Sequence, residues 1–229
     1  MSEYRRNLLR YNLIGGGKMR LPDWFKEHIV CWYSPKRQKA TNESLRADPR
    51  LIDLSGKGMD LQLVNCTFTE ASGINAEGAL KFSGVCYGRT ISFVGSNSFT
   101  YIAKRMFANY GNQVFCSHSS DAWQGWTGEV RNLNGSRECF IGGNSYVSIA
   151  PCFNTNLDIS WLSPTKYKDC ILRENPIYKP CEAPLTIGNI RVGDTLDRKF
   201  KGVLYDFFLF DETLSQEQID YVVNHLIDN

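Results

Sequence analysis

Short stretches in which apolar and polar residues alternate occur along most of the 229-residue chain and restrict it to a β-rich fold. The clearest are residues 80–83, 91–93 and 156–161. Alternation with a period of two places one face of a strand in a core and the other in water. Turn-forming pairs such as Ser55-Gly56 separate these stretches. Because no helical pattern lies between them, we predict an all-β, two-sheet antiparallel sandwich.

One helix is predicted, close to the C-terminus. Ser215, followed three residues later by Gln218, forms the pattern of a capping box, in which each residue satisfies a free backbone amide of the other. One apolar face then follows at helical spacing: Ile219, Val222, Val223 and Leu226. We expect this helix to pack on the edge of the sandwich.

Length and charge exclude several classes of protein. A chain of 26.1 kDa is compatible with a single all-β domain. A net charge of +2 gives no overall signature of nucleic-acid binding. The longest apolar run, residues 203–210, is interrupted by an acidic residue and is far shorter than the ~20 residues that span a bilayer. We therefore expect neither a nucleic-acid partner nor membrane insertion.

Residues 1–22 differ from the rest and are predicted to form a flexible basic arm ahead of a domain at 23–229. A triplet of glycines at 15–17 would cost too much backbone entropy inside a helix or strand. No secretion signal is apparent, because polar residues interrupt any apolar core after the first arginines. The arm either docks onto a partner or is a disordered tail. For docking, the candidates that would share one helical face are Arg5, Arg6, Leu9, Arg10 and Leu13.

Eight cysteines occur singly along the chain, with no Cys-x-x-Cys pair. Zinc sites usually use closely spaced ligand pairs, so a metal site is the least favoured alternative. Disulfides are a second alternative. The interpretation we favour is buried or partly buried free thiols in a protein that folds in a reducing cytosol.

Several motifs in order along the chain resemble those of laminin-G-like, concanavalin A-like lectin and glucanase domains. The resemblance covers roughly residues 29–227 and implies a jelly-roll sandwich, a fold that serves lectins, adhesins, hydrolases and structural modules. The motifs are DLSGKGMD (53–60), GALKFSG (78–84), SFT (98–100), LTIG (185–188), FKGVLYDFFLF (200–210) and LSQEQI (214–219).

The leader has a separate resemblance. Its sequence SEYRRNLL, residues 2–9, is similar to the openings of tail- and fibre-type proteins of phages and prophages of gut Bacteroidetes. That resemblance implies a protein made in the host cytoplasm without a signal peptide and carried on a virion.

A loop-like stretch at 117–126 offers a glycan site. Sugars present apolar faces to indole rings and hydroxyl groups to carboxylates and amides. The candidate residues are His118, Asp121, Trp123, Gln124 and Trp126. The alternative is that the tryptophans only pack into the core.

Calcium is a candidate cofactor, and no other is expected. Asp53 and Asp60 flank a glycine-rich turn, as do Asp194 and Asp197 at a second turn, and calcium requires several oxygen ligands. Aspartates beside glycine also simply form turns.

Catalysis is not expected. The chain lacks the Glu-x-Asp-x-x-Glu strand of the glucanases that the main resemblance covers, which would place two carboxylates on one face at a distance that suits glycoside cleavage.

These observations predict a non-catalytic structural component of a phage virion, displayed at the particle surface and able to bind glycans. Its expected partners are other virion proteins or further copies of itself, bound through the arm, and a cell-surface glycan. A bacterial carbohydrate-binding or adhesion module is the first alternative, and a degenerate glycoside hydrolase is the second.

Overall fold

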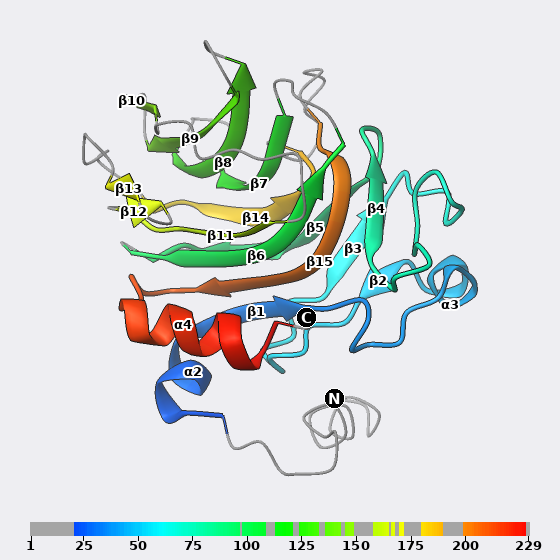
Figure 1. Ribbon diagram of the computed structural model, residues 1–229, viewed down its shortest axis with the longest axis horizontal. Coiled ribbons are helices and arrows are strands. Elements are labelled where there is room, and N and C mark those ends of the chain that lie inside the picture. The colour runs from blue at the N-terminus through cyan, green and yellow to red at the C-terminus, as the bar shows by residue number, and fades with distance from the viewer. Residues whose placement is uncertain are drawn as a thin grey trace.

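Two antiparallel sheets pack face to face in the computed structural model, which confirms the predicted all-β sandwich (Figure 1). The structure describes residues 21–96, 98–108, 113–120, 124–132, 136–142, 145–148, 158–164, 166–167, 170–171, 180–189 and 199–227. Within these residues, one sheet has seven strands and the other has eight.

The seven-stranded sheet follows the order β1, β15, β6, β11, β12 and β13, with β4 pairing to β15 beside this path. Its strands are β1 (Ile29–Tyr33), β4 (Leu80–Ser83), β6 (Thr100–Phe107), β11 (Asp158–Leu162), β12 (Lys166–Tyr167), β13 (Cys170–Ile171) and β15 (Lys201–Phe210).

The eight-stranded sheet follows the order β10, β9, β8, β7, β14, β5, β3 and β2. Its strands are β2 (Arg50–Leu51), β3 (Leu61–Val64), β5 (Tyr87–Val94), β7 (Gln113–Ser119), β8 (Gly125–Asn132), β9 (Ser136–Gly142), β10 (Ser145–Ser148) and β14 (Glu182–Ile187).

The main core lies between the sheets and is rich in aromatic rings. Tyr101 of β6 and Phe207 of β15 face Phe115 of β7, with ring centroids about 6 Å apart. The predicted alternation is confirmed in β4, where Leu80 and Phe82 are buried and the residues between and after them are exposed.

A second core covers the outer face of the seven-stranded sheet. The predicted C-terminal helix is α4 (Gln216–His225), and its capping box between Ser215 and Gln218 is present. It packs across the outer face of the sheet, not on the sandwich edge as the sequence suggested (Figure 1). Ile102 of β6 and Phe208 of β15 are fully buried in this second core. The sheet is therefore buried on both faces.

Two short helices were not anticipated by the sequence pattern. Helix α2 (Asp23–His28) joins the second core through Phe25. Helix α3 (Asn42–Ala47) begins with its own capping box between Thr41 and Ser44. Each has six residues, too few for an apolar periodicity to be visible. Within the described residues, no helix is both long and apolar enough to cross a membrane.

One predicted strand pattern is wrong. The sequence placed Ile91 with Phe93 on a buried face, but the side chain of Ile91 is 67% exposed. The register between β5 and β14 shifts between Pro184 and Thr186. Such a bulge adds a residue to one strand and breaks the period of two on which the prediction depended.

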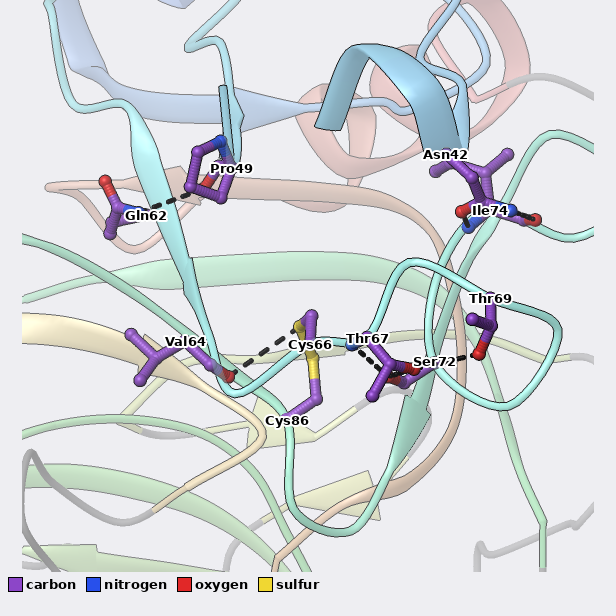
Figure 2. Close-up of a disulfide and its surroundings, with 10 residues drawn as sticks. All are labelled: Asn42, Pro49, Gln62, Val64, Cys66, Thr67, Thr69, Ser72, Ile74 and Cys86. Carbon is purple, nitrogen blue, oxygen red and sulfur yellow. Dashed lines mark hydrogen bonds between the residues drawn. A yellow bond between two sulfur atoms is a disulfide. The ribbon is translucent and has the colours of Figure 1, made fainter. Parts of the chain in front are cut away.

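A disulfide between Cys66 and Cys86 corrects the preference for free thiols at these two positions (Figure 2). Strand β3 pairs with β5 with Val64 opposite Tyr87, so the residues just beyond this pair meet although they are 20 positions apart. Their Cα atoms are 4.7 Å apart, within the range that a disulfide spans. Three other cysteines have free, buried thiols, as expected: Cys31, Cys116 and Cys181.

Hydrogen bonds hold the segment that the disulfide closes. Figure 2 shows the side chain of Asn42, at the start of α3, facing Ile74. The Asn42 amide oxygen accepts a hydrogen bond from the backbone N–H of Ile74, and the Asn42 amide nitrogen donates one to the Ile74 carbonyl. The hydroxyl of Ser72 accepts from the backbone N–H of Thr67 at 2.9 Å. The segment is thus fixed at its base by the disulfide and along its length by α3.

Candidate functional site

A small cavity opens between the two sheets at the end of the sandwich where β1 and β6 begin and where β5 and β15 end (left in Figure 1). Its volume is about 150 Å³. The cavity lies at this end because the chain leaves β5 through Gly95 and Ser96 and re-enters the other sheet at Phe99, so the two sheets are not closed against each other there.

Aromatic rings form the inner wall of the cavity. Phe99 stacks on Trp126 with centroids 4.6 Å apart and planes 12° apart. Phe93 packs against the imidazole of His118 with centroids 4.3 Å apart. Together these four rings form the inner, mostly aromatic wall of the cavity.

His118 is fully buried at the back of this wall. Its Nε2 lies 3.2 Å from the carbonyl oxygen of Phe93, which can only accept, so Nε2 carries the proton. Burial lowers the pKa of His118, and the nearby carbonyls of Phe93 and Ala183 only partly oppose that shift. The ring is therefore neutral at neutral pH. Behind it, the thiol of Cys181 bonds the carbonyl of Gln124 at 3.4 Å.

The rim of the cavity is polar and includes Ser96, Ser98 and Asp211. The carboxylate of Asp211 is half exposed, and its Oδ1 lies 3.2 Å from Nδ1 of His28. Nε2 of the same imidazole lies 3.0 Å from Oε2 of Glu212. The His28 imidazole and these two carboxylates form a polar cluster at the mouth of the cavity.

The structure brings together two of the predicted glycan-binding residues, but not on an exposed loop. Trp126 and His118 lie on neighbouring strands with rings 6.4 Å apart, and both are almost completely buried. They contribute the inner wall of the cavity from strands β7 and β8, not from a loop, and the burial of Trp126 in the main core agrees with the alternative that this tryptophan packs there. Gln124 is exposed and lies outside the cavity lining. Asp121 and Trp123 lie outside the described residues.

The other side chains of the site carry no signal in the sequence that marks them as functional. Phe99 lies inside the SFT motif, which was used only as a mark of the fold. Phe93 was predicted as an ordinary core residue, and Asp211 follows the last strand without any local motif. These residues come together only because the ends of β5 and β15, which belong to different sheets, face each other at this end of the sandwich.

The two aspartates suggested for calcium have structural hydrogen bonds instead. The carboxylate of Asp53 accepts bonds from the amides of Trp32, Ser55 and Met59 at 2.9–3.1 Å, and from the Ser55 hydroxyl at 2.8 Å. Oδ1 of Asp60 accepts from the Asp53 amide at 3.1 Å. An ion would have to displace these donors. Among the described residues, no three His, Cys, Asp or Glu side chains gather in a metal-binding arrangement.

Two further predictions fall on parts of the chain outside the described residues. These are the second suggested calcium turn, at Asp194 and Asp197, and the docking arm, at Arg5, Arg6, Leu9, Arg10 and Leu13. Both stay predictions from the sequence.

No protein-family model matches the chain, and a comparison with curated proteins finds no match. Solved structures with a similar fold do exist. One is domain 4 of AbnA, a GH43 extracellular arabinanase from Geobacillus stearothermophilus, in complex with arabinotriose. It is 12% identical with a TM-score of 0.55, and the match covers 83% of this chain and 96% of that domain.

Two further neighbours are larger proteins. Trypanosoma rangeli sialidase is 12% identical with a TM-score of 0.61, and the match covers 99% of this chain and 38% of the sialidase. A structure that concerns the interaction of botulinum neurotoxin type C with two ganglioside molecules is 13% identical with a TM-score of 0.51, covering 87% of this chain and 51% of that chain. The chain thus spans between about a third and a half of these two proteins.

The comparisons define the class of fold. At these identities they show a shared β-sandwich fold, as the alternating pattern and the motifs predicted. They give no support to the phage resemblance of residues 2–9.

Proposed function

We propose that this chain is a non-catalytic carbohydrate-binding module, and that the cavity at the end of its sandwich receives one sugar unit of a glycan. The observation that carries the proposal is an aromatic inner wall facing a polar rim within one cavity. Sugars combine apolar CH faces with hydroxyl groups and need both kinds of surface. The neighbouring fold solved with arabinotriose adds support.

The size of the cavity limits what can enter. A volume of about 150 Å³ corresponds to roughly five water molecules at ~30 Å³ each. Pockets for drug-sized ligands occupy ~300–1,000 Å³. The cavity therefore takes a single terminal sugar ring, or a substituent of one, and the rest of a glycan lies outside it.

The absence of catalysis is part of the proposal. Glycosidases of the usual kind place two carboxyl groups about 5–10 Å apart across the scissile bond. Asp211 is the one carboxylate in the described lining of the cavity. A sensitive assay for release of reducing sugars from arabinans, glucans and sialosides tests this point directly.

A more specific proposal is that the protein is displayed on a phage virion and binds its partners through residues 1–22. This proposal depends on the resemblance of residues 2–9 to phage tail and fibre proteins. Co-purification of the chain with virus particles would support it. The carbohydrate-binding proposal stands independently of that outcome, because the cavity is lined by residues of β1, β5, β7, β8 and β15 and of the segments that follow β5 and β15.

The proposal is tested by plugging the cavity at its mouth. Val94 lines the cavity and is 71% exposed, so Val94→Trp adds bulk at the entrance without disturbing the core. Ile91→Trp is the matched control, since Ile91 is 67% exposed on the same strand and does not line the cavity. A panel of neutral and acidic glycans is screened on the full chain by saturation-transfer NMR, followed by titration.

We expect Val94→Trp to weaken glycan binding by about tenfold or more, whereas Ile91→Trp stays within about twofold of the unmodified chain. Equal binding by all three chains would place the glycan elsewhere. No binding to any glycan at millimolar concentration would refute the proposed function.

A further inference from the structure

The charge at the mouth of the cavity is unusually one-sided. Asp211 lines the cavity, and Glu212 is the next residue in the chain. The His28 imidazole lies between their two carboxylates, with Nδ1 next to Asp211 and Nε2 next to Glu212. Even with His28 protonated, two carboxylates against one imidazolium leave a net negative charge. The described stretch 202–227 contains no Lys or Arg.

Among the described residues that line the cavity, no positive charge compensates for this. None of the described lining residues is Lys or Arg. The imidazole of His118 is held neutral by burial, as its lowered pKa shows, and its Nε2–H is already used by a carbonyl oxygen. A carboxylate bound in the cavity would therefore lose water without gaining an ionic partner, which is costly.

We propose that this cavity prefers neutral sugars over sugars that carry a carboxylate, and that Asp211 sets this preference. The inference rests on the proposed function and adds the class of ligand. A sugar hydroxyl can donate to the Asp211 carboxylate, and a hydrogen bond to an ionised acceptor is stronger than one between neutral groups. A carboxylate at the same place offers no proton and meets a like charge.

The size of the discrimination follows from the position of Asp211. Its carboxylate is half exposed, so the repulsion acts through a partly aqueous medium. We take the carboxylate of a bound acidic sugar to lie about 6 Å from the Asp211 carboxylate, with an effective dielectric constant between that of water and that of a protein surface. The repulsion then weakens the affinity for the acidic sugar by about tenfold. Because salt shortens the screening length to ~3 Å at 1 M, the discrimination should shrink at high ionic strength.

The experiment uses pairs of sugars that differ only at C6. Methyl β-glucoside is compared with methyl β-glucuronide, and methyl α-galactoside with methyl α-galacturonide, by titration of the full chain at low and high salt. The unmodified chain should bind the neutral member of a pair about tenfold more tightly at low salt. Asp211→Asn should reduce this preference to about twofold, mainly by strengthening binding of the acidic member.

Two further variants separate a local effect from a general one. Glu212→Gln removes the same unit of charge beside the cavity but outside its described lining, and should change the preference less than Asp211→Asn does. Val94→Lys adds a positive charge at an exposed position of the rim, where folding is not at risk, and should strengthen binding of the acidic member.

The possible outcomes are distinguishable. Equal or tighter binding of the acidic sugars by the unmodified chain would overturn the proposed selection and leave the carbohydrate-binding function standing. An unchanged preference in both Asp211→Asn and Val94→Lys would also overturn it. Failure of the unmodified chain to bind any member of either pair, or any glycan of the wider panel, would refute the proposed function and this inference with it.

Discussion

Reduction of the disulfide between Cys66 and Cys86 should destabilise the whole domain. The bond closes a loop with a sequence separation of 20 between β3 and β5, which are neighbours in the eight-stranded sheet, and β4 of the other sheet lies within this loop. In the chain-entropy description, a loop of that length corresponds to about 3 kcal/mol of lost stability at 25 °C. For a chain of this size, with a urea dependence of about 3 kcal/mol per molar, the midpoint of unfolding should fall by about 1 M.

The assay is urea unfolding, followed by tryptophan fluorescence, with and without a thiol reductant. The control is the double variant Cys66→Ala/Cys86→Ala, whose midpoint should be low and should not respond to the reductant. Because Cys86 is fully buried, this variant also loses packing, so its midpoint should lie at or below that of the reduced chain. Mass spectrometry of the alkylated, unreduced protein should show residues 66 and 86 in one linked peptide.

The reasoning fails in either of two cases. One is a linked peptide together with equal midpoints in both conditions, which would mean that the loop is already ordered in the unfolded chain. The other is the recovery of Cys66 and Cys86 as separately alkylated peptides from protein purified under oxidising conditions.

Three further predictions concern stability. Ser215→Ala should cost about 1 kcal/mol, because the hydroxyl caps α4, and a urea midpoint equal to that of the unmodified chain would contradict it. Asp53→Asn should cost about 2–3 kcal/mol through lost charge-assisted bonds, and added calcium should not restore the melting temperature. Burial, and secondly the Glu77 carboxylate, raise the pKa of Tyr205 to about 12. Since an unfolded tyrosine ionises near pH ~10, the stability from this phenol is complete below that pH and is lost as the pH rises through about 12. Glu77→Gln should shift the phenolate absorbance to lower pH, and an unchanged titration would show that Glu77 has no part in it.

The sequence predicted the fold where local chemistry and tertiary packing agree. Ser215 and Gln218 form the predicted capping box because both partners lie within one helical turn. Leu80 and Phe82 alternate with exposed neighbours because β4 has only one buried face. In each case a few consecutive residues contain the whole explanation.

The prediction failed where a distant strand decides. Ile91 is exposed because the register shifts where β5 pairs with β14, a segment about 90 residues later in the chain. Cys66 and Cys86 meet only because β3 and β5 are paired. The candidate site shows the same limit: Trp126 and His118 were predicted as ligand-binding residues by type, yet Asp211, which lines the same cavity, directly follows β15 and carries no local signal.

The position of β15 between β6 on one side and β1 and β4 on the other has a consequence for synthesis. It pairs with β1, where Tyr33 lies opposite Phe207, and also with β6 and β4. While the ribosome is still making the first 200 residues, β1 and β6 have no strand between them, and the aromatic faces that Phe207 and Phe208 later cover stay open. Contacts between residues so distant in sequence form slowly, and exposed strand edges recruit other chains. The nascent protein should therefore depend on chaperones until its last strand emerges, and a premature stop codon before residue 201 should yield an aggregating fragment, not a smaller folded domain.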